Sequence, residues 1–387
     1  MEATGIRNTD TIFGLKQKLE VQPQLKRLNK PALKSIKSPD GDIIDCVHIK
    51  NQPAFDHPWL KNHTIQMRPG SHPKGLSFDE SNNVSSNSKP EITQLWHLNG
   101  RCPGGTIRIR RTKEEDLLRV SSAANYGRKK HYTTLNVDEG DLHEYALVYE
   151  RGDKYYGAQA TMNVWNPQTQ IRNEFTLSQF WITGGGFGNI NTIEAGMMVN
   201  PVLYGDNKTR IFTFWTTDSY KKTGCYNLLC PGFVQVDNQI ALGACLSHIS
   251  IYGGNQYELN FNVWKDDKDG NWWLQLRGTS NYQLGYWPSS LFTILSDSAS
   301  EIQWGGEVIN THQDGKHTTT QMGSGHFPEE GFGKASYFKF LKVNDGTKAL
   351  RDPKDTGIII TQPNCYDILN SGSSFYYGGP GRDPKCP

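Results

Sequence analysis

Short segments that alternate between apolar and polar residues recur along the chain from residue 143 onward. The alternation occurs at 143–150 (HEYALVYE), 157–165 (GAQATMNVW), 210–217 (RIFTFWTT), 257–266 (YELNFNVWKD), 271–278 (NWWLQLRG) and 335–343 (ASYFKFLKV). Segments of this kind, rich in aromatic and β-branched residues, predict strands with one buried and one polar face. Turn sequences such as DKDGN at 267–271 separate them. The pattern therefore predicts an all-β fold, an antiparallel β-sandwich or jelly roll.

The first third of the chain has a weaker pattern. Four leucines between residues 15 and 28 have near-helical spacing, but Pro23 and Pro31 interrupt it, which leaves room for one or two short helices. Residues 50–92 are rich in Pro, Asn, His and Ser and predict irregular chain. We therefore expect a smaller N-terminal domain at 1–135 and the β-sandwich at 136–387, with an exposed, basic linker between them.

Composition and charge narrow the class of protein. At 387 residues the chain is long enough for two domains, and a mean hydropathy of -0.62 makes it polar. The formal net charge of +2 excludes the basic field of a typical nucleic-acid-binding protein. No run of about 18 apolar residues predicts a membrane span. Two local basic runs, RIRR at 108–111 and RKK at 128–130, are interpreted as surface or processing segments.

The seven cysteines indicate an oxidising compartment. The candidate disulfides are Cys225–Cys230, Cys365–Cys386 and, as a third pair, Cys46–Cys102. The first two pairs each close a short loop, as disulfides of secreted β domains do, and Cys245 is left over. Neither short-loop pair has the CxxC or CxxH spacing of a zinc site, so no metal and no cofactor is predicted.

Three sequons, at Asn62, Asn83 and Asn207, are compatible with secretion and glycosylation. The opening MEATGIRNTD contains no apolar signal core, so the expectation of secretion rests on the cysteines and the sequons and not on the N-terminus. We expect a secreted monomer that binds neither membranes nor nucleic acid.

Three stretches of the β region concentrate unusual residues. Residues 181–196 (WITGGGFGNINTIEAG) contain a triple glycine and Glu194, and residues 301–308 (EIQWGGEV) contain two glutamates. Residues 321–338 (QMGSGHFPEEGFGKASYF) contain His326 next to an acidic pair, Glu329 and Glu330. No P-loop is present, because Lys and Ser/Thr do not follow the glycines, and no GxSxG nucleophile elbow occurs. The triple glycine at 184–186 is expected to let a strand bend.

A cysteine nucleophile is disfavoured by the strand pattern. Cys245 has His248 three residues later, and in a strand a three-residue step puts the two side chains on opposite faces. His312 and His317 lie in a polar turn, THQDGKH, and are expected to be solvated loop residues. Carboxylates remain as the candidates for chemistry.

Two acidic or amide side chains on facing strands can hold a water molecule between them. One side chain accepts a proton from the water, and the other stabilises or protonates the reacting oxygen. Glu194 and the stretch 301–308 have the residue types for this chemistry.

Within EIQWGGEV, strand alternation puts Glu301 and Gln303 on one face and Ile302 and Trp304 on the other. The glycine pair that follows is a place where the register can shift before Glu307. On the pattern alone, each glutamate is better explained as a solvated strand residue than as a catalytic one.

Longer stretches resemble the plant neprosin family. Residues 46–70 (CVHIKNQPAFDHPWLKNHTIQMRPG) and 102–112 (CPGGTIRIRRT) resemble its activation segment. Residues 191–236, which begin NTIEAGMMVNPVLYGDNKTR, resemble its peptidase domain, as do WGGEVIN at 304–310 and MGSGHFPEEGFGKASYF at 322–338. The resemblance runs from about residue 13 to the end. It implies a secreted glutamic peptidase that cuts beside proline at acidic pH, is made as a zymogen, and has a concanavalin-like β-sandwich.

The resemblance also implies one catalytic glutamate on each side of a cleft. The first corresponds to Glu194 in TIEAG, and the second to the start of an EWGGE-type stretch, where this chain has Gln303. A Glu/Gln pair can still act, with Glu194 as the base and the Gln303 amide as oxyanion donor. Glu307 is the second candidate for the partner. If two carboxyl groups are needed and one is missing, the chain is instead a catalytically weakened extracellular binding protein.

Further features follow from the resemblance. The pairs Cys225–Cys230 and Cys365–Cys386 match the family's disulfides. Trp304 is a candidate to stack on the ring of a substrate proline, although it is equally well explained as sandwich core. The N-terminal segment would be an intramolecular inhibitor until acid protonates carboxylates at its interface. A glycoside hydrolase, which also uses two carboxylates, is a further alternative.

Overall fold

The computed structural model describes residues 20–75, 94–129 and 142–387, apart from Phe187, Thr279, Gln313, Asp314 and Lys348. The expected domain boundary at residue 135 and the sequon at Asn83 lie outside these residues. In the described part of the chain, no helix is long and apolar enough to span a lipid bilayer.

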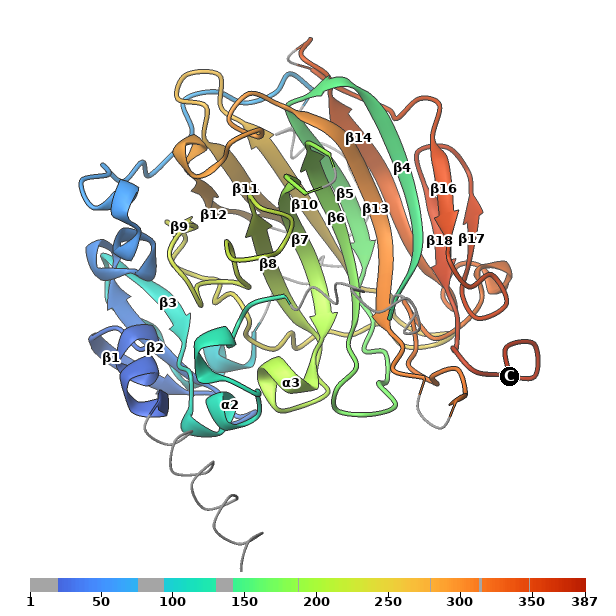
Figure 1. The fold of residues 1–387 in the computed structure, drawn as a ribbon, viewed down its shortest axis with the longest axis horizontal. Helices are drawn as coiled ribbons and strands as arrows, with labels where there is room; N and C mark the ends of the chain where they lie inside the picture. Colours follow the sequence, from blue (N-terminus) through green and yellow to red (C-terminus); the bar gives the residue numbers. More distant parts are fainter. Residues whose placement is uncertain are drawn as a thin grey trace, which may run out of the picture.

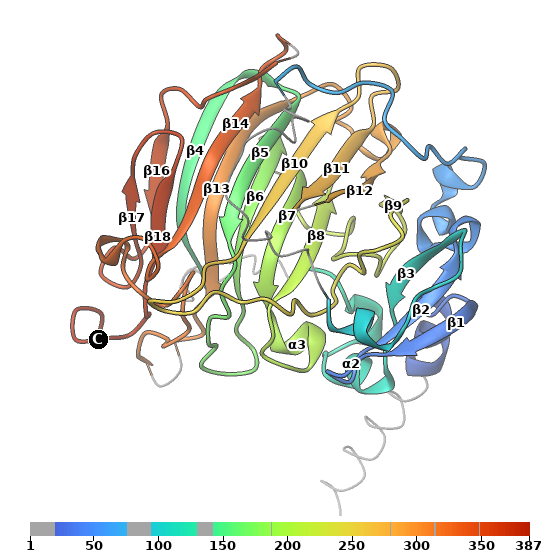
Figure 2. The ribbon, with the colours of Figure 1, turned by 180° about the vertical axis from the view of Figure 1, so that it is seen from behind.

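The chain from His143 onward forms two stacked antiparallel sheets, seen from one side in Figure 1 and from behind in Figure 2. The six-stranded sheet, called the front sheet below, has the strand order β16-β4-β13-β6-β7-β8. Its strands are β4 (His143–Tyr155), β6 (Thr176–Gly184), β7 (Asn191–Val199), β8 (Arg210–Thr216), β13 (Ala299–Ile309) and β16 (Gly357–Ile360). The predicted all-β sandwich is confirmed.

The second sheet, the back sheet, has the order β17-β18-β14-β5-β10-β11-β12-β9, and β15 pairs with β14. Its strands are β5 (Gly157–Asn163), β9 (Val234–Gln235), β10 (Glu258–Lys265), β11 (Trp272–Arg277), β12 (Asn281–Trp287), β14 (Ser336–Asn344), β15 (Leu350–Arg351), β17 (Asp367–Asn370) and β18 (Phe375–Gly378). Each of the six alternating stretches found in the sequence corresponds to one of the strands of the two sheets.

The N-terminal domain is a separate three-stranded sheet that lies beside β8 and β9 at one end of the sandwich (Figure 1). Its strands are β1 (Ala32–Lys37), β2 (Ile43–His48) and β3 (Thr106–Arg110). Residues 20–28 are helical, which agrees with the leucine spacing and with the break at Pro31. The expected interruption at Pro23 is wrong, because the helix continues through this residue. The short helices are α2 (Glu114–Leu118), α3 (Pro201–Tyr204), η1 (Ile49–Asn51), η2 (Pro53–Asp56), η3 (Pro58–Leu60), η4 (Leu95–Asn99), η5 (Ala123–Asn125), η6 (Ser289–Leu291) and η8 (Pro328–Glu330).

The basic run RIRR is not a surface segment, which corrects the interpretation made from the sequence. It overlaps β3, where Arg108 and Arg110 are 4% and 9% exposed. Arg110 is buried because Asp42 and Asp116 pair with its guanidinium group. Sequence composition alone does not show these partners, because Asp42 is far away in the sequence.

The N-terminal domain is hydrogen-bonded to the backbone of residues 235–241 by two glutamine side chains. The Gln52 amide donates to the carbonyl of Gln235 at 3.1 Å and accepts from its N–H at 2.8 Å. The Gln94 amide makes the same two contacts with Ala241, both at 2.8 Å. These buried side chains therefore satisfy backbone groups of the sandwich.

The space between the two sheets is filled by aliphatic and aromatic side chains. Trp272, Trp287, Trp304, Phe261 and Phe338 are fully buried in this core. Trp304 therefore packs inside the sandwich, on the side of β13 that faces the back sheet.

All three candidate disulfides are formed: Cys46–Cys102, Cys225–Cys230 and Cys365–Cys386. The first lies within the N-terminal domain and the other two within the sandwich. Cys245 is buried with a free thiol.

Candidate active site

Glu194 lies on β7 and is fully buried, with its carboxylate on the outer face of the front sheet. Three side chains donate hydrogen bonds to it. The Gln179 amide donates to Oε2 at 3.0 Å, and the hydroxyls of Thr192 and Tyr220 donate to Oε1 at 2.9 and 2.8 Å. Such donors compensate a carboxylate for the loss of water.

Glu307 lies on β13 and is also fully buried. Its Oε1 is 2.6 Å from Nδ1 of His143, the first residue of β4, and its Oε2 is 3.1 Å from Nζ of Lys129. Glu307 therefore has two basic partners, one on the sandwich and one just before the linker.

Lys129 connects the two glutamates. Its Nζ is 3.5 Å from Oε2 of Glu194 and 3.1 Å from Oε2 of Glu307, and its side chain is 8% exposed. The ammonium group also lies 5.2 Å from the centre of the Tyr220 ring, at cation–π distance. Two carboxylates that come from different strands thus converge on one cation, which occupies the space between them.

These contacts set the ionisation of the group. Burial alone would raise the pKa of Glu307, but Lys129 and His143 outweigh it and lower that pKa to about 2. Burial alone would lower the pKa of Lys129, but Glu194 and Glu307 hold it well above its ordinary value. The lysine is therefore charged and Glu307 ionised at neutral pH.

The register of β13 explains why Glu307 faces the same side as Glu194. Residues 301–308 pair with β4 and β6 without a bulge, so the register does not shift at the glycine pair. Gly305 lies opposite Gln179, and Gln179 lies opposite Gly196 on β7. Because glycines flank Gln179, no side chain fills the sheet surface on either side of it.

Both glycines are also required by the backbone. A Cβ atom at Gly196 would lie 2.1 Å from the carbonyl oxygen of Ser178, and one at Gly305, where φ is +156°, would lie 2.2 Å from that of Ala146. The close approach of neighbouring strands thus keeps the surface between the two glutamates clear.

Gln303 is on the same sheet face but is not brought to either glutamate. It lies opposite Trp181, and Trp181 lies opposite Glu194, so two strand spacings, about 10 Å, separate Gln303 from β7. Its amide donates to Oε1 of Glu301 at 2.7 Å. Glu301 in turn pairs with the exposed Arg151 at 2.9 Å.

The tryptophan near the glutamates is Trp181, not Trp304. Trp181 lies on β6 directly between Gln303 and Glu194, on the outer face, whereas Trp304 is in the core. It belongs to an apolar cluster on the outer face, which includes Leu177, Met198, Phe212, Phe214 and Tyr226 from the sandwich and Val21, Leu28, Leu117, Ala123 and Tyr126 from the N-terminal domain. The N-terminal domain thus covers the apolar surface beside the two glutamates.

Two loops bring tyrosines to this surface. After β8, Ser219 and Tyr220 both have left-handed backbone conformations, with φ of 58° and 62°, and this places the Tyr220 hydroxyl on Glu194. Tyr226 lies within the loop closed by the disulfide Cys225–Cys230, and its ring packs 4.9 Å from that of Phe214. The disulfide therefore holds an aromatic side chain at the site.

The other candidates from the sequence lie elsewhere. Burial raises the pKa of the Cys245 thiol to about 11, so it is not a thiolate at neutral pH. His326 pairs with Glu330 at 2.8 Å on the surface. The sequons Asn62 and Asn207 are exposed.

His317 is not a solvated loop residue, which corrects the prediction, whereas His312 is exposed. His317 is 8% exposed and lies 2.8 Å from a carboxylate oxygen of Glu144. It also lies within 4.8 Å of the sulfurs of Cys365 and Cys386, a grouping that resembles a metal site. Both sulfurs are joined in a disulfide, so they are not thiolate ligands.

Sequence reasoning missed Lys129, His143, Gln179 and Trp181. Lys129 belongs to the RKK run, which was interpreted as a surface segment, but its partner Glu307 is 178 residues away. Gln179 and Trp181 follow the alternation of their strand, and only the pairing of β6 with β7 and β13 shows their relation to the glutamates. A long-range contact of this kind leaves no local pattern.

Both family models that match this chain describe neprosin proteins. Residues 172–380 match the family model described as Neprosin, and residues 35–149 match the model described as Neprosin activation peptide. Among solved structures, scytalido-glutamic peptidase bound to a peptide-based transition-state analogue is 12% identical, with a TM-score of 0.34 over 62% of this chain and 98% of that one. SCP-B, a member of the eqolisin family of peptidases solved with the tripeptide Ala-Ile-His, is 10% identical, with a TM-score of 0.34 over 62% and 98% of the two chains.

Proposed function

Because the chain belongs to the neprosin family and carries that family's activation peptide ahead of its peptidase domain, we propose that it is a secreted glutamic endopeptidase zymogen that cleaves beside proline after exposure to acid. The observation that carries this proposal is the convergence of Glu194 and Glu307 on Lys129. Two buried carboxylates that share one removable cation form a pair suited to acid–base catalysis once the cation leaves. The three disulfides support secretion.

In the proposed reaction the pair holds a water molecule where Lys129 lies in the zymogen. One carboxylate takes a proton from the water as its oxygen attacks the peptide carbonyl carbon. The other, protonated at acidic pH, gives its proton to the leaving nitrogen as the C–N bond breaks. Gln303 has no part in this scheme, because its amide is bonded to Glu301.

Latency follows from the same contacts. Lys129 fills the position of the water, and the N-terminal domain covers the apolar cluster on the outer face. A second buried link joins the domains, because Asp42 in the N-terminal domain pairs with both Arg110 and Arg210, the first residue of β8. Acid would neutralise the carboxylates of both links, and cleavage between Lys129 and His143 would then separate inhibitor from enzyme.

The test of the proposed function compares the unchanged protein with Gln303→Glu. Each is incubated in acid, and kcat/KM for a proline-containing peptide is measured from pH 2 to 7. We expect both to cleave, with values within about threefold, because Gln303 is half-buried, contacts Glu301 and lies away from both glutamates of the pair. A silent parent together with an active Gln303→Glu variant would show that the catalytic partner of Glu194 is position 303 and that the chain has lost it.

Trp181 is proposed to contact the substrate proline, because it is the tryptophan beside Glu194 on the outer face. Trp181→Ala is expected to raise KM for a proline peptide by about three- to tenfold, the worth of one aromatic contact, with a smaller change in kcat. Trp181→Phe is the conservative control and should keep most of the affinity. Equal losses for proline and alanine at the same peptide position would argue against a role in recognising proline.

A further inference from the structure

His143 is placed to act on Glu307 after Lys129 has gone. Its Nδ1 lies 2.6 Å from Oε1 of Glu307, while Lys129 binds the other oxygen, Oε2. The two basic groups therefore bind Glu307 independently. Lys129 precedes the linker in which we propose cleavage, whereas His143 begins β4, which pairs with β13 from Ile309 back to Ala299. Loss of the N-terminal domain would leave His143 in the sandwich.

The residue after His143 fixes the start of β4 from the opposite face of the sheet. Glu144 is 3% exposed, accepts a hydrogen bond from the Asn310 amide at 2.9 Å, and lies 2.8 Å from Nε2 of His317. The other ring nitrogen of His317 lies 2.8 Å from the carbonyl oxygen of Thr318. Burial would lower the pKa of His317, but its contacts with Glu144 and the Thr318 carbonyl outweigh it and raise that pKa. This favours a protonated ring that donates to both acceptors and forms a buried ion pair with Glu144.

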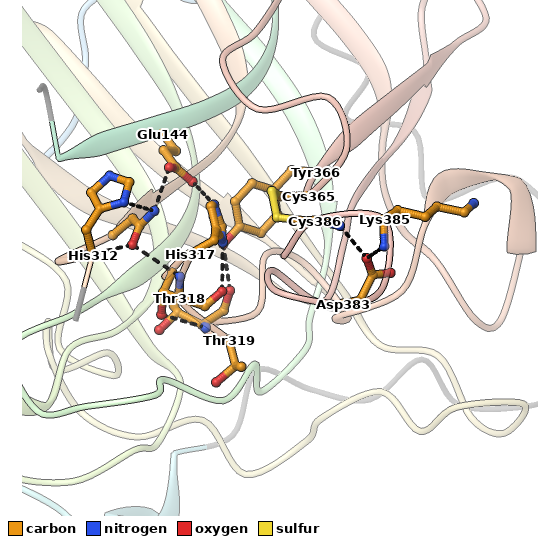
Figure 3. The surroundings of a disulfide bond; sticks show 12 residues. Glu144, His312, His317, Thr318, Thr319, Cys365, Tyr366, Asp383, Lys385 and Cys386 are labelled. Carbon is orange, nitrogen blue, oxygen red and sulfur yellow. Dashed lines mark hydrogen bonds and ion pairs between the residues drawn. A yellow bond between two sulfur atoms is a disulfide. The ribbon is translucent and has the colours of Figure 1, made fainter. Parts of the chain in front are cut away.

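This ion pair is supported by the C-terminal disulfide. Figure 3 shows Glu144 directed at His317, with Tyr366 and the Cys365–Cys386 disulfide beside the imidazole. The Tyr366 ring centre is 5.7 Å from that of His317. A strand whose first residues are held in this way does not depend on the preceding linker for its position.

We propose that His143 is a positioning residue of the activated protein, which orients Glu307 and makes it, and not Glu194, the carboxylate that accepts the proton of the attacking water. The proposal rests on the proposed function. It follows from an asymmetry between the two glutamates, because Glu307 keeps a basic neighbour when Lys129 leaves. The donors to Glu194 are an amide and two hydroxyls, none of which carries a charge.

The charged and titratable groups around Glu307 come from four parts of the fold. They are His143 on β4, Lys129 before the linker, Glu194 on β7, and Tyr226 in the disulfide loop beside β8. After Lys129 is removed, His143 is the basic group among these four, and it stays 2.6 Å from Oε1 of Glu307. A cation at this distance lowers the pKa of a carboxyl group by one unit or more.

The experiment compares acid-activated preparations of the unchanged protein, His143→Gln and His143→Arg. Glutamine keeps a neutral donor and arginine keeps the charge. For His143→Gln we expect the acid limb of the kcat/KM profile to move to higher pH by about one unit or more, with little change of KM on the plateau. This corresponds to about a tenfold loss at a given pH on that limb. His143→Arg should return the limb toward that of the unchanged protein.

His326→Gln is the matched control, because His326 also contacts a glutamate but lies on the surface away from the pair. An acid limb that stays in place in an active His143→Gln variant would overturn the role of His143 and leave the peptidase proposal standing. If the unchanged protein cleaves no peptide, or if Glu307→Gln cleaves as well as the parent, the proposed function itself fails. The experiment therefore distinguishes a failure of the His143 proposal from a failure of the proposed function.

Discussion

Replacing Glu307 with glutamine is expected to lower kcat of the acid-activated protein toward a proline peptide by about a thousandfold, the usual worth of a general acid or base. The substitution keeps the shape of the side chain and its place on β13 but removes the carboxylate that faces His143 and Lys129. Glu194→Gln should cause a loss of similar size. The two losses should not add, because each removes one half of the same pair.

Glu301→Gln is the control for this measurement. Glu301 is on the same face of the same strand, but it pairs with Arg151, whose side chain is 62% exposed. We expect its kcat to remain within about twofold of the parent, since surface ion pairs contribute little. Activity that survives in Glu307→Gln but is lost in a variant of position 301 or 303 would place the catalytic partner nearer the start of EIQWGGEV.

Replacing Asp42 with asparagine is expected to let the zymogen convert at a pH at which the parent stays intact. Asp42 is 4% exposed and is paired with the buried guanidinium groups of Arg110 and Arg210. Removing one partner of a buried ion pair can cost about 3–5 kcal/mol. The cost is smaller here, because Arg110 keeps Asp116 and Arg210 keeps Asp206. Here two arginines, one from each domain, would lose their shared partner.

The stability of the closed form is expected to fall as the pH falls. Burial would raise the pKa of Asp42, but Arg110 and Arg210 outweigh it and hold that pKa below its ordinary value of 3.8. The pKa of Glu307 is likewise lowered from 4.5 to about 2. A group with a lowered pKa stabilises the closed form above its ordinary pKa, and this contribution is lost as the pH falls through the lowered value. The closed form should therefore weaken between about pH 4.5 and pH 2.

The measurement is the rate at which the 43.6 kDa chain converts to a shorter form at each pH. Asp45→Asn serves as the control, because Asp45 pairs with Arg111 inside the N-terminal domain, where the arginine side chain is 36% exposed. It should convert at nearly the same pH as the parent. If Asp42→Asn and the parent share one conversion profile, the link between Asp42 and Arg210 does not keep the zymogen closed.

The sequence predicted the sandwich well because its strands depend on local alternation. It also named Glu194 as a candidate, through a resemblance to a family that the family model confirms. The catalytic role of Glu194 stays a prediction. The partner of Glu194 was harder to predict from the sequence, because its identity depends on whether β13 keeps its register through two glycines. The pairing is unbroken, so Glu307 stays on the face of Gln303, and side-chain direction then decides which of them meets Lys129.

Alternation alone already separated Trp304 from the glutamates, since it put this residue on the face opposite Gln303. Trp181 could not be recognised in the same way, because its closeness to Glu194 depends on which strand lies beside β7. The buried arginines of RIRR and the buried His317 have the same explanation. A charged residue in a polar stretch looks exposed until its distant carboxylate partner is known.

The glutamines that join the N-terminal domain to residues 235–241 have a consequence for the activated protein. Gln52 occupies the backbone N–H and carbonyl of Gln235 in β9, the last strand in the order of the back sheet. Once the N-terminal domain leaves, this strand edge offers unpaired donors and acceptors to any extended chain. The proposed activation would therefore uncover, together with the proposed catalytic pair, a strand edge that can pair with another chain, and the N-terminal domain covers this edge in the form described.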